Sequence, residues 1–389
     1  MNSKFRFVSV VVFIVLGIMV TSCATGSVEQ GSKMSEASGS AAEAEAIMAT
    51  DEHEADAHDD EHEAEEHEHD AEAEMLMLPE LNATDLNGAP LRVIATTSII
   101  GDVVAQVGGD AIDLTVLMTP GQDPHSYEPA AQDLTAVSSA DVIFVNGWDL
   151  EENLVRNLES IGEEALIIPI SANIAPRAFA EGDHDEHEGE EAEHEEEEDH
   201  EEGEHEHGGA DPHVWFSVHN VEQWAENVEH VLSDLDPANA TTFEANAAVY
   251  MVALEELEEY AEVELERIPS EKRFLVTNHD SFGYFAEEYG FTLLGTVIPS
   301  MSTLSEPSAS DLTDLITEMK AHNVCTIFTE TTLNDTLAKT VAGELDGCDE
   351  VQVLKLHTGA IGSAGSGTDS YIGMFQANVD AIVSGLNND

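Results

Sequence analysis

The sequence predicts an α/β protein of two lobes, each with a parallel β-sheet and flanking helices, joined by one long helix. Short apolar runs of strand length alternate with helical patterns over residues 91–169 and again over residues 274–386, which is typical of parallel sheets covered by helices. Between these stretches, apolar residues recur at spacings of three or four from Phe243 to Ile268. This spacing indicates a helix of nearly thirty residues, about 45 Å long.

In the first lobe, the expected strands and helices follow one another closely. We expect strands over 91–96, 113–118, 142–145 and 165–169, and helices over 99–107, 132–138 and 151–158. In such sheets, ligands bind beyond the carboxyl ends of the strands. The loop 121–129 lies at such an end and combines a glycine, two prolines and His125, so it is a candidate binding loop.

The second half of the chain repeats the alternation after a helical segment. We expect helices over 220–234, 243–268, 282–289, 308–321, 335–345 and 371–386, and strands over 274–277, 291–296, 324–328 and 351–356. Ser308 with Asp311 resembles a capping box at a helix start. His279 comes just after the strand 274–277, again at a carboxyl end.

The charge of the chain is strongly negative and unevenly distributed. The formal net charge is -69 over 389 residues, and residues 51–74 and 181–207 hold 31 of the 81 acidic residues and 11 of the 18 histidines. Such a balance argues against nucleic acid as a partner and favours cations.

The N-terminus predicts export from the cytoplasm. Lys4 and Arg6 precede an apolar run, 7–20, which is too short for a stable transmembrane helix. Small residues then lead to Cys23. This resembles a bacterial lipoprotein signal over residues 1–23, with lipidation of Cys23; a plain secretory signal is the alternative. Both place the mature protein outside the cytoplasm.

Two acidic, histidine-rich tracts interrupt the globular pattern. Residues 24–88 lack sustained apolar periodicity, and we expect a disordered tether there. The histidines of this tether could hold metal loosely, with simple solvation as the alternative. We expect the insertion 181–209 to be a mobile arm that binds cations weakly beside the main metal site. Its histidines are His184, His187, His194, His200, His205 and His207.

Of two further cysteines, Cys325 lies within the predicted strand 324–328 and Cys348 lies just before the next predicted strand, 351–356. The extracytoplasmic compartment permits disulfides. We expect a disulfide between them, and two buried free thiols are the alternative.

Three histidines share a context that surface histidines lack. Asp-Pro-His occurs at 123–125 and again at 211–213, and His279 follows a strand. Neutral imidazole is a common zinc ligand, and an adjacent carboxylate can orient the ring. We therefore expect His125, His213 and His279 to bind one metal ion, with release in mild acid near the reference pKa of about 6.5.

Three other histidines, His219, His230 and His322, lack this context, and we expect them on the surface. We expect Trp215 and Tyr127 to pack in the wall of the cleft that holds the ion.

Several segments together resemble the metal-binding receptors of bacterial ABC importers, the group of solute-binding proteins that includes ZnuA and TroA. The segments are 121–129, Asn146-Gly147, 211–215, 277–282, Glu306-Pro307-Ser308 and 371–378. The resemblance covers roughly residues 89–387. It implies two Rossmann-like lobes with the metal between them. It also implies a monomeric, membrane-anchored receptor that delivers its ion to an ABC permease driven by a cytoplasmic ATPase.

The resemblance also assigns positions and boundaries. The first three metal-ligand positions of the family fall on His125, His213 and His279. Manganese-type members often have Glu at the third of these positions, so a histidine there favours Zn2+ over Mn2+. The fourth, Asp in many manganese-type members, falls on Gly359, which leaves water, a nearby carboxylate or an insertion histidine as the fourth ligand, with His357 a weaker choice. The expected divisions are an N-terminal lobe over 89–218, a helical linker over 219–268 and a C-terminal lobe over 269–389.

Other functions remain open at this point. A manganese receptor of the same family is one alternative. Three histidines and a water also describe a catalytic zinc site, as in a hydrolase, although neither His-Glu-x-x-His nor Gly-x-Ser-x-Gly occurs in the sequence. The third alternative is a surface zinc store that acts mainly through the two acidic tracts.

Overall fold

The computed structural model describes most of the chain from residue 74 onwards. The described residues are 74–151, 154–155, 166–178, 209–348 and 350–387, and all of them belong to one compact unit, 67–389. The predicted signal peptide with Cys23, the tether up to residue 73, most of the predicted helix 151–158 and the six insertion histidines lie outside the described residues.

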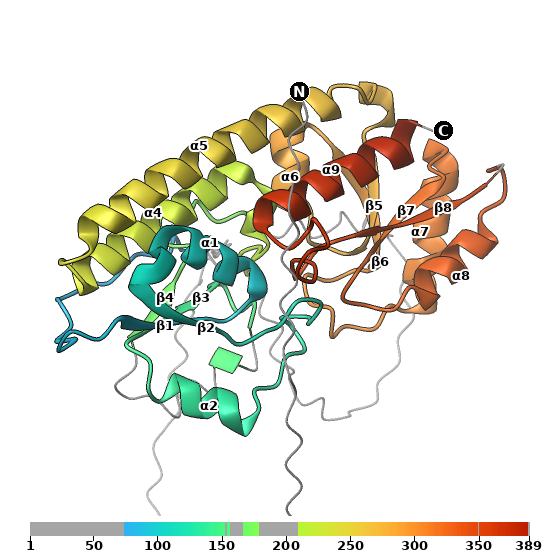
Figure 1. The fold of residues 1–389 in the computed structure, drawn as a ribbon. Helices are drawn as coiled ribbons and strands as arrows, with labels where there is room; N and C mark the ends of the chain where they lie inside the picture. Colours follow the sequence, from blue (N-terminus) through green and yellow to red (C-terminus); the bar gives the residue numbers. More distant parts are fainter. Residues whose placement is uncertain (1–73, 152–153, 156–165, 179–208, 349, 388–389) are drawn as a thin grey trace, which may run out of the picture. The chain divides into compact units, whose positions relative to one another are not determined.

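The N-terminal lobe is built on a four-stranded parallel sheet in the order β2-β1-β3-β4 (Figure 1). Its strands are β1 (Leu91–Ala95), β2 (Ile112–Val116), β3 (Val142–Val145) and β4 (Leu166–Pro169), and its helices include α1 (Ser98–Gly108) and α2 (Ala131–Val137). Because all four strands run in the same direction, their carboxyl ends lie at one edge of the sheet. The loop that carries His125 leaves β2 at this edge.

Two helices follow the N-terminal lobe and pack against each other, α4 (Val218–Leu235) and α5 (Ala240–Leu265). The 26 residues of α5 span roughly 39 Å, which confirms the predicted long helix. Its buried side chains form one stripe: Phe243, Ala247, Tyr250, Leu254, Leu257, Ala261 and Leu265. α5 contacts α1 of the first lobe and the final helix α9 (Tyr371–Asn387) of the second, so it joins the two lobes through packed apolar surface.

The C-terminal lobe contains two parallel strand pairs, β5–β6 and β7–β8, and β5 lies beside β7 (Figure 1). The strands are β5 (Phe274–His279), β6 (Thr292–Ile298), β7 (Thr326–Glu330) and β8 (Gln352–Leu356). The helices are α6 (Gly283–Tyr289), α7 (Ala309–His322) and α8 (Thr336–Glu344), besides α9. The fold class, with parallel strands and flanking helices in two lobes, is as predicted.

Strand β5 is longer than expected. The apolar pattern stops at Thr277, but Asn278 and His279 continue the pairing with β6 and are both buried. His279 is therefore the last residue of the strand rather than the second residue after it. A polar side chain at a buried strand end breaks the apolar pattern without ending the strand.

The predicted capping box at the start of α7 is confirmed. The Ser308 hydroxyl accepts a hydrogen bond from the Asp311 amide at 3.2 Å, and the Asp311 carboxylate accepts one from the Ser308 amide at 2.7 Å. Two backbone N–H groups of the first turn are thereby satisfied.

The described residues before 89, where we expected the lobe to start, already contact the folded chain. Residues 74–88 lie along the N-terminal lobe as an extended segment: the Leu76 carbonyl accepts from the Asn173 amide at 2.8 Å, and the Thr84 amide donates to the Leu235 carbonyl at 2.9 Å. Leu78, Leu81 and Leu86 pack against the hydrophobic core. These few leucines are sufficient to anchor a short segment, although the composition of residues 24–88 as a whole predicts disorder.

None of the helices in the described part of the chain has the length and apolar character needed to cross a lipid bilayer.

Cys325 and Cys348 form a disulfide, with sulfurs 2.02 Å apart and Cα atoms 5.8 Å apart. Cys325 directly precedes β7, and its carbonyl accepts from the amide of Gln352 at the start of β8. The bridge closes a loop with a sequence separation of 23 that contains α8.

The double variant Cys325→Ser/Cys348→Ser should lower the free energy of unfolding by about 3 kcal/mol, because an open loop of this length has more conformational freedom in the unfolded chain. Denaturation in guanidinium chloride measures the change, with reduced and oxidised wild type as controls. A midpoint equal to that of the oxidised wild type would show that the bridge adds no stability.

Candidate metal centre

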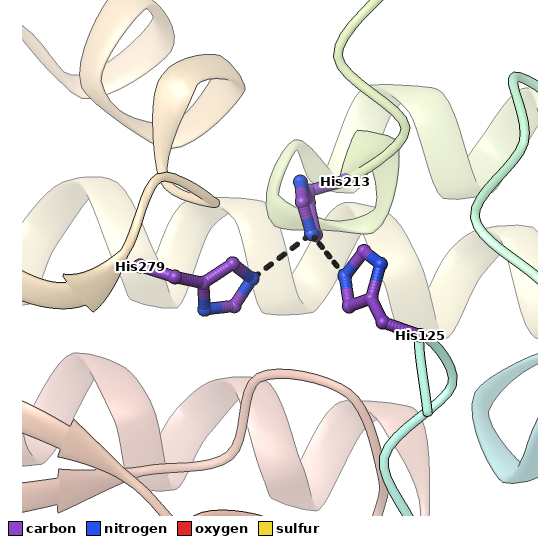
Figure 2. Close-up of side chains that lie close together, drawn as sticks. All are labelled: His125, His213 and His279. Atoms are coloured by element: carbon purple, nitrogen blue, oxygen red, sulfur yellow. Dashed lines mark hydrogen bonds between the residues drawn. The ribbon is translucent and has the colours of Figure 1, made fainter. Parts of the chain in front are cut away.

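Three buried histidines from distant segments meet at the carboxyl ends of the strands. His125 lies in the loop after β2, His213 directly precedes the short 3-10 helix Val214–Phe216, and His279 ends β5. Their side chains point toward one another (Figure 2). They are 3%, 1% and 2% exposed, so water contributes little to their environment.

The three rings approach through their Nε2 atoms. Nε2 of His213 lies 3.2 Å from Nε2 of His125 and 3.2 Å from Nε2 of His279 (Figure 2). One ring nitrogen from each residue can be chosen so that all lie within 4.8 Å of one another. Among the described residues this is the one group of three or more His, Cys, Asp or Glu side chains with such spacing.

Two of the rings are oriented by buried carboxylates. Nδ1 of His213 donates to Oδ1 of Asp211 at 2.9 Å, and Nδ1 of His279 donates to Oε1 of Glu330. An ionised carboxylate only accepts hydrogen bonds, so each Nδ1 carries the proton. The Nε2 lone pairs of His213 and His279 are therefore free, and both face the centre of the cluster.

The two Asp-Pro-His segments use their aspartates differently. In both, the Asp side chain accepts from the His backbone amide, at 3.2 Å for Asp123 and His125 and at 3.0 Å for Asp211 and His213, which stabilises a turn. Asp211 in addition contacts its histidine ring, as we expected. Asp123 does not, and Nδ1 of His125 is buried without a hydrogen-bond partner among the described residues.

Burial and neighbouring charges separate the pKa values of the three rings. Burial, followed by the nearby rings of the other two histidines, lowers the pKa of His125 to about 3. Burial and the charge of His279 also lower the pKa of His213. Burial alone would lower the pKa of His279 as well, but the charge of Glu330 and its hydrogen bond outweigh this effect and raise it. The uniform value of 6.5 that we assumed from the sequence is therefore wrong for each ring.

Glu330 is the important residue that sequence reasoning missed. It is 2% exposed and ends β7, beside the end of β5. Burial would raise its pKa, but the charge and hydrogen bond of His279 lower it overall. Its second oxygen, Oε2, accepts from the Thr358 hydroxyl at 2.5 Å. Its position at the end of a buried strand was a signal in the sequence, but the strand was expected to stop at residue 328.

Two predicted aromatic wall residues differ in their distance from the cluster. The Trp215 ring lies 5.4 Å from that of His213 and lines the small cavity between the three histidines. Its Nε1 donates to the Thr358 carbonyl at 2.8 Å. Tyr127 is buried, but its hydroxyl donates to Asp133 at 2.9 Å and it does not line the space.

Gly359 borders the cluster, where the resemblance placed a fourth ligand, but a side chain does not fit there. A Cβ on Gly359 would lie 2.6 Å from Cδ of Pro124, well inside van der Waals contact. Its φ is not in the left-handed region, so the restriction is steric. His357 lies outside the cluster, and its backbone pairs with the side chain of Asn378.

The remaining described histidines outside the cluster occupy helices. His219 and His230 lie on α4, and His322 lies at the end of α7. Each contacts a carboxylate three or four residues away on its own helix. All three side chains lie on the surface, as expected, although that of His322 is only 42% exposed.

The family model and the similar proteins agree on one family for this chain. Residues 93–385 match the model of the ZnuA family, described as the periplasmic component A of a zinc-uptake complex. The chain is 32% identical over 307 residues to the manganese-binding lipoprotein MntA of Halalkalibacterium halodurans, covering 79% of this chain and 92% of that protein. It is 31% identical over 307 residues to the manganese ABC transporter substrate-binding lipoprotein PsaA of Streptococcus pneumoniae, covering 77% of this chain and 90% of that protein.

Solved structures show the same similarity. The periplasmic zinc-binding protein TroA of Treponema pallidum superposes with a TM-score of 0.65 at 27% identity, covering 77% of this chain and 99% of that chain. A manganese-bound periplasmic metal-binding protein of Candidatus Liberibacter asiaticus superposes with a TM-score of 0.62 at 26% identity, covering 76% and 99%.

These relatives and structural neighbours are solute-binding receptors rather than enzymes. Family members work outside the cytoplasm, and several relatives are named as lipoproteins. The chain belongs to the ZnuA family of metal-binding receptors of ABC importers.

Proposed function

We propose that this protein captures Zn2+ outside the cytoplasm with His125, His213 and His279 and delivers the ion to the permease of an ABC importer. The observation that carries the proposal is the convergence of three Nε2 atoms in a buried space. With both Nδ1 protons held by carboxylates, Nε2 of His213 and Nε2 of His279 each present a lone pair to the other. These two lone pairs repel unless a proton or a metal ion lies between them.

The spacing of the nitrogens suits a divalent ion. Two nitrogens bound to zinc at about 2.05 Å in a tetrahedral arrangement lie about 3.3 Å apart. The distances from Nε2 of His213 to the other two Nε2 atoms are both 3.2 Å. These two pairs are therefore already at the spacing that a bound ion requires, and the third pair, His125 with His279, lies within 4.8 Å.

The donor set favours zinc over manganese. Three imidazole nitrogens suit zinc, whereas manganese prefers oxygen-rich ligands. The carboxylates that border the rings are already engaged: Glu330 with His279, Asp211 with His213, and Asp123 with the amide of His125. The steric limit at Gly359 adds to this preference. Manganese remains the alternative because MntA and PsaA are named for it.

The other parts of the chain would support the capture of the ion. Lipidation at Cys23 would anchor the receptor to the membrane. The lobes over 89–218 and 269–389, with the linker 219–268, would enclose the ion, and the insertion 181–209 would supply auxiliary, weaker metal contacts. A fourth position on the ion is available to water.

Replacing any one of His125, His213 and His279 with Ala should weaken zinc binding by roughly a hundredfold or more, since even residues that only support a ligand account for 10–100-fold. Calorimetric titration with zinc and manganese, together with metal analysis of the purified proteins, measures the effect. His219→Ala is the matched control, because this histidine is exposed on α4.

Two outcomes would overturn parts of this assignment. Wild-type affinity in the three variants would exclude the cluster as the primary site. Tighter binding of manganese than of zinc by the wild type would favour the manganese receptor.

Zinc affinity should fall as the pH drops through the raised pKa of His279, by up to tenfold per pH unit, because a proton on its Nε2 competes with the ion. Above that pKa the affinity should be constant. In Glu330→Gln the charge that raises the pKa is absent and burial lowers it, so the fall should begin at a lower pH. Affinities measured from pH 5 to 9 test this; parallel curves for the two proteins would contradict the role of Glu330.

Deletion of residues 181–207 separates a receptor from a store. A receptor should keep one tight zinc site, because none of the three histidines lies in the deleted segment. Zinc titration by calorimetry gives the number and affinity of the sites. Loss of the tight site together with nearly all capacity would instead indicate a store.

A further inference from the structure

A loop of the C-terminal lobe reaches the loop that carries His125. Residues 299–308 join β6 to α7, and Thr303 lies near the middle of this segment. Its hydroxyl donates to Oδ2 of Asp123 at 2.7 Å. This hydrogen bond joins the two lobes across residues separated by 180 positions in the sequence.

Each end of this bond leads directly to a histidine of the cluster. On one side, Oδ1 of Asp123 accepts from the amide of His125 at 3.2 Å. On the other side, the carbonyl of Ser300 accepts from the amide of Asp280, the residue after His279, at 3.0 Å. The Thr303–Asp123 bond therefore connects the backbone of a histidine in one lobe to that of a histidine in the other.

The loop that presents Thr303 is held by its own serines. Oγ of Ser300 accepts from the Ser302 amide at 3.1 Å and from the Ser305 hydroxyl at 2.9 Å. Oγ of Ser302 accepts from the Leu304 amide at 3.3 Å. The hydroxyl of Thr303 is thus positioned by local contacts and does not depend on a bound ion.

Of the three histidines, His125 is the one whose ring is not held by a carboxylate. The rings of His213 and His279 are each fixed by a carboxylate at Nδ1. Nδ1 of His125 has no partner within the described residues. The placement of the His125 ring therefore depends on its backbone, which Asp123 holds.

We propose that Thr303 is a positioning residue that latches the two lobes over the cluster and slows the release of the bound ion. The inference rests on the proposed function, since it assigns the ion to the same three histidines. Breaking the bond frees the His125 loop to move away from His213 and His279. The ion then loses one of its three nitrogens more often, and it dissociates faster.

Several other contacts between the lobes do not involve Thr303 and would remain. Nε1 of Trp215 donates to the Thr358 carbonyl, and the Tyr371 amide donates to Asp102 at 2.8 Å. The latch should therefore affect the exchange of the ion without separating the lobes.

Thr303→Val removes the hydroxyl and keeps the shape of the side chain. Release of zinc into excess chelator, followed by stopped flow, should be faster by on the order of tenfold, the factor typical of a hydrogen bond to a charged group. Thr303→Ser retains a hydroxyl and should restore a rate within about twofold of the wild type. Thr317→Val is the matched control, because the Thr317 hydroxyl donates only to the Thr313 carbonyl of its own helix.

A measurement without metal separates this inference from the proposed function. In the metal-free protein, Thr303→Val should speed hydrogen exchange of the loop 119–130, where the His125 amide donates to Asp123, and Thr317→Val should not. Faster exchange would support the latch even if the wild type bound no zinc tightly. Unchanged exchange and an unchanged rate of zinc release in Thr303→Val would overturn it.

Discussion

The histidine cluster depends on two buried pairs of a carboxylate and an imidazole, Asp211 with His213 and Glu330 with His279. Each pair holds a proton on Nδ1 and directs an Nε2 lone pair to the same space. Buried carboxylates are costly unless positive charge lies nearby. Arg177 supplies part of this charge to Asp211 at 3.5 Å, and a divalent ion bound by the three imidazoles would supply more. The groups that orient the histidines therefore also favour a cationic cargo.

The fold places these groups by bringing strand ends together. His279 and Glu330 end the neighbouring strands β5 and β7, and His125 follows β2 of the other lobe. Burial of α5 against elements of both lobes keeps the lobes together. The histidines can therefore be far apart in the sequence and still meet without a long, adaptable loop.

The alternation of strands and helices and the long helix could be predicted from the sequence, because each leaves a local pattern of apolar spacing. The convergence of the three histidines could also be predicted, because His125 and His213 share an Asp-Pro-His segment and His279 follows an apolar strand pattern. Glu330 was missed because the strand was expected to stop at residue 328, and its contact with His279 arises from the packing of β7 beside β5. The sequence also did not show that Asp211 contacts the ring of its histidine whereas Asp123 does not, because the two Asp-Pro-His segments are identical and only the direction of the rings differs. Gly359 appeared as a missing ligand, whereas the structure adds a reason: its neighbour Pro124 occupies the space.

The most direct test is a crystal structure of the zinc-loaded protein with anomalous diffraction recorded on both sides of the zinc absorption edge. The account predicts one strong anomalous peak among the three rings, with Nε2 atoms of His125, His213 and His279 about 2.0–2.1 Å from the ion. A principal zinc peak elsewhere on the chain, or an ion in this space bound mainly by carboxylate oxygens, would contradict it.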